Sequence, residues 1–149
     1  MIIRSIIDGK ELNEEQKKFS EMLLRVSTKG IPVVARLTEA DLGEEVVVLN
    51  ADCSVAELTG HYNEMNEYAK PKWLDELEEI EYEGKRPVLM IKDFDKIELK
   101  EHSKFNEILK YKKISTFDLP ENCVVILSWN SHRPIEIYEG TMPYVAFSN

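Results

Sequence analysis

Apolar residues gather into short unbroken runs along the chain, and two of these runs lead directly into polar residues. Residues 87–91 form one run, which Lys92 and Asp93 follow; residues 123–128 form another, and Asn130 comes shortly after it. Runs of this length, rich in Val, Ile and Leu, are typical of strands buried on both faces of a parallel sheet. Further short runs rich in β-branched residues lie at 31–37 and 45–50, and another short strand is expected at 144–147. We therefore expect a sheet of about five strands, most of them parallel.

Between these runs, the apolar positions recur with the period of amphipathic helices. Asn13 and Gln16 have the spacing of a capping box that begins a helix, and further helices are expected at 54–60, 72–82 and 104–111. Strands that alternate with helices predict a three-layer α/β fold, with helices flanking the sheet. No linker or repeat divides the chain, so we expect 1–149 to form one domain, with 1–30 as an N-terminal strand and helix extension.

The composition narrows the classes of partner. The chain has 149 residues, 43% of them hydrophobic, and a formal net charge of −9. An acidic protein repels phosphate groups, which argues against binding to nucleic acid or to an anionic membrane. No apolar run approaches the length of a membrane span, and Cys53 and Cys123 lack the spacing of a metal or redox motif. These features predict a soluble cytoplasmic protein with two reduced thiols.

Charge is distributed unevenly along the chain. Residues 37–83 hold fourteen acids against two lysines, a net charge of −12. Residues 85–113 hold nine basic residues against five acids, a net charge of +4. Opposed charges of this kind suit contact with a second copy of the chain or with a partner protein, although solvated helix faces give the same pattern.

The order of several segments resembles a known family. Residues 50–60, 71–74, 84–97, 105–109 and 119–130, in that order and spacing, look like the core of an AAA+ ATPase from its second strand through sensor 1. The resemblance covers roughly 45–130 and implies a fold of the P-loop NTPase type. In that family, an Asp-Glu pair at the end of the Walker B strand helps to hold Mg²⁺ and polarises the attacking water, and sensor 1 is commonly an Asn beside the γ-phosphate. The Walker B positions fall here on Lys92 and Asp93, and the sensor falls on Asn130.

The sequence departs from the family where ATP would bind. Residues 31–45 contain one glycine and four acids, with no GxxxxGK[ST] loop, whose backbone N–H groups and following helix would neutralise the phosphates. Lys92 places an ammonium group where a magnesium-facing carboxylate belongs. The resemblance also stops before the helical lid. We therefore expect Asp93 and Asn130 to be vestigial catalytic positions in a chain without ATPase activity.

The resulting functional prediction is a non-catalytic binding or assembly module without a cofactor, which associates with itself or with a partner protein. Two alternatives remain open at this point. One is an AAA+ protein that binds ATP and Mg²⁺ through an unusual phosphate loop. The other is a metal-dependent phosphoryl-transfer enzyme in which Asp93 and Asp95 hold the metal.

Overall fold

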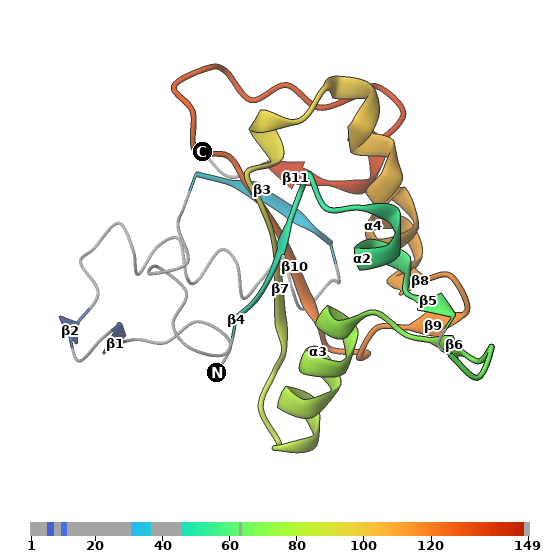
Figure 1. Ribbon diagram of the computed structural model, residues 1–149. Helices are drawn as coiled ribbons and strands as arrows, with labels where there is room; N and C mark the ends of the chain where they lie inside the picture. The colour runs from blue at the N-terminus through green and yellow to red at the C-terminus, as the bar shows by residue number, and fades with distance from the viewer. Residues whose placement is uncertain (1–5, 8–9, 12–30, 37–45, 63, 148–149) are drawn as a thin grey trace.

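A five-stranded parallel sheet forms the centre of the protein (Figure 1). The structure, a computed structural model, describes residues 6–7, 10–11, 31–36, 46–62 and 64–147. The strand order across the sheet is β11-β3-β10-β7-β4, and every neighbouring pair is parallel. The α/β fold and the five-strand sheet predicted from the sequence are thus confirmed. The bounds are β3 (Val33–Ala35), β4 (Val46–Asn50), β7 (Val88–Lys92), β10 (Val124–Ser128) and β11 (Ala146–Phe147).

The register aligns the carboxyl ends of the three strands β4, β7 and β10. On one side of β7, Asn50 lies opposite Lys92. On the other side, Ile91 lies opposite Leu127, so that the next residues along, Lys92 and Ser128, leave the sheet together. Polar residues from separate parts of the chain consequently meet at one edge of the sheet.

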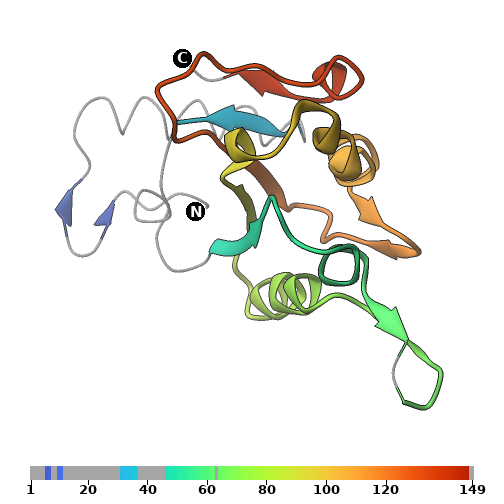
Figure 2. The same ribbon diagram turned by 45° about the horizontal axis from the view of Figure 1, so that its top comes forward.

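Three described helices cover one face of the sheet, as the two ribbon views agree (Figures 1 and 2). They are α2 (Val55–Thr59), α3 (Lys72–Tyr82) and α4 (Asn106–Tyr111). Their buried side chains join alternate strand residues in one core cluster, and full burial of each such side chain contributes roughly 1.5–3 kcal/mol. The largest fully buried members include Leu74, Leu77, Leu89, Ile91, Phe94, Phe105 and Ile108.

The opposite face of the sheet is also apolar and buried. Val33, Val88, Met90 and Ile126 are at most 1% exposed, and none belongs to the cluster beneath the three helices. Burial on both faces explains why these strands are unbroken apolar runs rather than alternating patterns. The helix predicted to begin at Asn13 lies outside the described residues, so the three-layer arrangement stays a prediction.

Several short elements of the structure were not predicted from the sequence. The helix expected at 104–111 is divided between the 3₁₀ helix η3 (Leu99–Phe105) and α4. Two-stranded antiparallel ladders form between β1 (Ile6–Ile7) and β2 (Lys10–Glu11), between β5 (His61–Tyr62) and β6 (Tyr68–Ala69), and between β8 (Lys113–Ile114) and β9 (Phe117–Asp118). Two short 3₁₀ helices, η2 (Phe94–Lys96) and η4 (Met142–Tyr144), complete the description. Within the described part of the chain, no helix is both long enough and apolar enough to cross a bilayer.

Candidate functional site

The strand order singles out one place on the sheet for a ligand. The chain leaves β3 toward β4 at one edge of the sheet, whereas it leaves β10 toward β11 at the other edge. In open parallel sheets, ligands bind in the crevice beyond the carboxyl ends of two such neighbouring strands. The candidate site is therefore the crevice beyond Ala35 of β3 and Ser128 of β10.

The structure brings together the two residues that the resemblance assigned to catalysis. The Asn130 side-chain amide donates a hydrogen bond to Asp93 Oδ1, with 3.1 Å between the two atoms. The Asp93 backbone N–H donates to the buried Ser128 hydroxyl at 3.0 Å, and Lys96 Nζ lies 3.4 Å from Asp93 Oδ2. Both oxygens of the Asp93 carboxylate are therefore engaged by groups of the same chain.

Asp95 lies in a separate hydrogen-bond network. Its side chain is 4% exposed, and Oδ2 accepts a hydrogen bond from the Ser131 backbone N–H at 2.9 Å. The Asp95 backbone carbonyl accepts from Arg133 Nη2 at 2.7 Å. Among the described atoms, Asp95 Oδ1 and Ser131 Oγ are buried without a hydrogen-bond partner. Asp95 thus anchors the loop that follows β10.

Arg36, which belongs to no recognisable sequence motif, lies across the crevice. It directly follows β3, and its guanidinium group donates to the backbone carbonyls of Ser131 and Arg133, the latter at 2.7 Å. The Trp129 indole N–H donates to the same Arg133 carbonyl at 3.1 Å. The only signal in the sequence was a charged residue inside the apolar run at 31–37. These contacts join the ends of β3 and β10 where a ligand would have to enter.

A cavity of about 370 Å³ opens beside Asp95, and the buried imidazole of His102 forms part of its wall. His102 Nδ1 accepts a hydrogen bond from the Tyr138 backbone N–H at 3.1 Å, and its ring lies 4.1 Å from the Phe94 ring. Burial lowers the pKa of His102, although the Phe94 backbone and Glu136 oppose this shift. The neutral imidazole therefore serves the packing of this loop.

The other residues considered for chemistry are buried thiols or residues whose described contacts belong to the sheet. The backbone carbonyl of Lys92 accepts a hydrogen bond from the Ala51 N–H at 2.9 Å, which continues the pairing of β4 with β7 beyond the last strand residue. Burial raises the pKa of the Cys123 thiol to about 12, so it stays protonated, and Cys53 is also a free buried thiol. Among the described residues, no three His, Cys, Asp or Glu side chains are grouped to hold a metal ion.

Comparison with known proteins adds no assignment. No protein-family model matches the sequence, and a search of curated proteins finds no relative.

Proposed function

We propose that this protein is a non-catalytic module that binds a partner protein through an AAA+-like α/β core. The observation that carries the proposal is the engagement of Arg36, Asp93 and Asn130 with groups of their own chain. Hydrolysis of ATP would need a carboxylate free to act on water and magnesium. Here the Asp93 carboxylate supports the loop after β10, and the guanidinium of Arg36 ties that loop to β3.

The sequence of the crossover from β3 to β4 supports the same proposal. Ten residues, 36–45, connect the two strands, and four of them are acidic. Without the glycine-rich loop, backbone N–H groups cannot surround a triphosphate, and the acids repel it. Lys92, at the end of β7, repels a divalent cation in addition.

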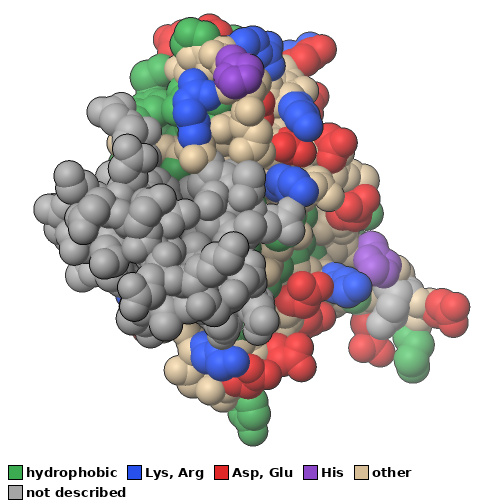
Figure 3. All heavy atoms as spheres, turned by 90° about the vertical axis from the view of Figure 1, so that its left-hand side faces the viewer, with side chains coloured by type: hydrophobic (Ala, Val, Ile, Leu, Met, Phe, Trp, Pro, Cys, Tyr) green, Lys and Arg blue, Asp and Glu red, His purple; other side chains and the backbone are tan. Residues whose placement is uncertain are grey.

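The exposed surface favours a protein as partner. Large apolar side chains are exposed on the hairpin formed by β5 and β6 and on α3, among them Tyr62, Met65 and Tyr82. Tyrosine and methionine are enriched in protein interfaces. In Figure 3, acidic side chains gather at the lower end of the visible face, whereas lysine and arginine side chains lie singly. Such a surface suits a basic partner.

A melting experiment tests the absence of nucleotide binding. Millimolar ATP with Mg²⁺ should leave the melting temperature unchanged, whereas a ligand at a hundred times its dissociation constant adds about 2.7 kcal/mol and raises it by several degrees. The Lys92→Asp variant should behave in the same way, because it restores a carboxylate but no phosphate loop. A saturable shift in either protein would overturn the proposal in favour of a nucleotide-binding module.

A further inference from the structure

We infer that the outer edge of β4, with the cavity beside it, binds an extended segment of a partner protein in which an apolar residue has basic residues two positions away on either side. This inference deepens the proposed function and rests on it, because it names the surface and the chemistry of the partner. The binding mode is the addition of a strand to an open sheet edge.

The backbone of β4 is able to accept a further strand. β4 is the last strand of the sheet, and β7 is its only partner among the described strands. The Ala51 N–H bonds to the Lys92 carbonyl of β7, so by alternation the N–H and C=O groups of Val46, Val48 and Asn50 point away from β7. β4 also carries no proline and no charged side chain, which are the usual protections of an exposed edge.

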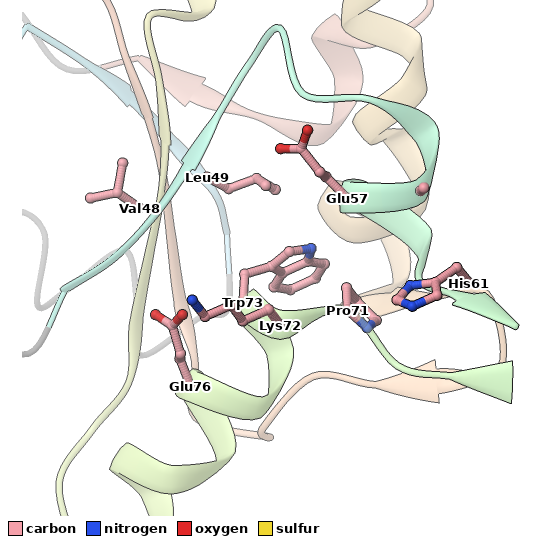
Figure 4. Close-up of a pocket in the computed structure, with 9 residues that line it drawn as sticks. Val48, Leu49, Glu57, His61, Pro71, Lys72, Trp73 and Glu76 are labelled. Carbon is pink, nitrogen blue, oxygen red and sulfur yellow. The ribbon is translucent and has the colours of Figure 1, made fainter. Parts of the chain in front are cut away.

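A cavity of about 350 Å³ lies directly along this edge (Figure 4). It is lined by both Val48 and Leu49. Successive side chains of a strand point to opposite faces of the sheet. A cavity that touches both Val48 and Leu49 therefore borders the edge of β4 that faces away from β7. Pro71 and Trp73, at the start of α3, add apolar surface, and the indole is held in place by its hydrogen bond to the Leu58 carbonyl at 3.1 Å. An apolar side chain of an added strand fits this environment.

The charge around the cavity specifies basic neighbours for that apolar side chain. Figure 4 shows Glu57 of α2 and Glu76 of α3 on opposite sides of Trp73. Residues 55–83, which include both helices, hold nine acids against two lysines, and one of these lysines, Lys70, is paired with Glu78 at 2.7 Å. Lysine or arginine residues two positions before and after the apolar residue would lie on the same face of the added strand and would complement this surface.

The same charges argue against a second copy of the chain as the occupant. If two β4 edges paired with each other, the acidic helices of both copies would meet, and like charges across an interface are unfavourable. The basic stretch of the chain is no substitute, because from 99 to 111 it is folded as η3 and α4 and cannot add as a strand. The fitting occupant is an extended basic segment of another protein.

A labelled peptide tests the inference directly. The probe is a fluorescein-labelled ten-residue peptide in which threonine occupies every second position and lysine and valine take turns at the positions between, so that lysine and valine share one face of the strand. It is titrated with the full chain at low salt and followed by fluorescence anisotropy. We expect saturable binding. A peptide of equal charge with N-methylated valines, which cannot form the strand hydrogen bonds, should bind at least about tenfold more weakly. A peptide in which glutamate replaces every lysine should bind no more tightly than the N-methylated peptide.

Matched variants locate the binding surface. Val48→Pro removes an outward N–H without touching the ladder to β7, whereas Val48→Thr keeps the N–H and the branched shape. We expect Val48→Pro to weaken binding about tenfold or more and Val48→Thr to preserve it; the double variant Glu57→Lys, Glu76→Lys should weaken it comparably. Melting curves establish that each variant is folded, and if Val48→Pro is not, the N-methylated peptide and the charge variant decide.

Three outcomes overturn the inference. Equal binding of the lysine–valine peptide and its N-methylated form would show attraction by charge alone. No binding of any peptide, or a dimer of the chain that Val48→Pro dissociates, would exclude a basic extended partner at this edge. None of these results depends on nucleotide binding, so the melting experiment with ATP judges the proposed function separately.

Discussion

A single guanidinium group holds the end of β3 against the loop that follows β10. Arg36 makes both contacts with one planar fork, and its partners lie 95 and 97 residues further along the chain. Lysine carries the same charge but lacks this geometry. The interaction therefore depends on the shape of the side chain as well as on its charge.

We predict that Arg36→Ala lowers the free energy of unfolding by about 1 kcal/mol, the typical net contribution of a hydrogen-bonded group. Arg36→Lys should recover only part of the loss, because an ammonium group cannot reach both carbonyls in the same way. Urea denaturation measures both effects. Wild-type stability in Arg36→Ala would show that the loop is held without this contact.

His102 makes stability depend on pH. Burial lowers its pKa in the folded state below the ordinary value of 6.5, so the unfolded chain binds the proton more readily. Its contribution to stability is fully present above pH 6.5 and is lost as the pH falls from there through the folded-state pKa. Urea denaturation at several pH values should show this loss. The His102→Gln variant, which keeps a hydrogen-bond acceptor, should show a flatter profile between pH 7.5 and pH 5.5; an identical slope would contradict the assignment.

At the scale of elements, Gly60 fixes the junction between α2 and β5. Its φ of +92° and ψ of −176° are accessible almost only to glycine, and a Cβ there would lie 2.2 Å from the Ala69 carbonyl oxygen. Gly84, which follows α3, also has a positive φ, +81°, but a Cβ there would meet nothing within 4 Å. Gly84 is therefore required only for its backbone conformation, whereas Gly60 is required both for its conformation and because a side chain would clash.

We predict that Gly84→Ala destabilises the protein by about 1 kcal/mol, through the left-handed conformation alone. Gly60→Ala should cost more than this, because the hairpin formed by β5 and β6 must shift to relieve the close contact. Thermal melts of the two variants provide the comparison. Equal losses would mean that the hairpin moves freely with respect to α2.

At the scale of the whole molecule, the sequence was informative wherever burial imposes a pattern. The runs at 87–91 and 123–128 correspond to β7 and β10 within one residue, because strands covered on both faces admit only apolar side chains. The family resemblance assigned Asp93 and Asn130 to one site, and in the structure their side chains are joined by a hydrogen bond. No local pattern could reveal Arg36, or the stacking of Tyr68 on Phe117 at 5.5 Å, which joins two short hairpins. Both contacts depend on how distant segments pack.

The structure also changes how the positive charges between 85 and 113 are understood. Lys112 is half-buried, and its ammonium group donates to the Cys123 carbonyl at 3.0 Å. Lys104 donates to the Cys53 carbonyl, and the Arg86 guanidinium donates to the Asn122 carbonyl. These side chains stabilise the fold, so fewer of them are available for head-to-tail contact with another copy.

We therefore predict that the protein alone sediments as a monomer at low and at high salt. A dimer that dissociates as salt rises would instead support contact between the acidic and basic segments, since the Debye length falls from about 10 Å at 0.1 M to about 3 Å at 1 M. Lys110→Glu with Lys113→Glu would then weaken it, and these variants leave the structural Lys112 intact. A dimer indifferent to salt would indicate an apolar interface.

The strand order determines when each strand of the nascent chain can pair with its neighbours. β4, β7 and β10 pair with one another in the order in which the ribosome makes them. β3 is synthesised before all three, yet its neighbours are β10 and β11, which follow it by roughly ninety to a hundred and ten residues. Val33, Val34 and Ala35 therefore lack their sheet partners until β10 and β11 have been made, and exposed apolar strands are prone to aggregate. Among the five described strands, the first to be made thus waits longest for its partners, and this interval is when the chain is most exposed to aggregation.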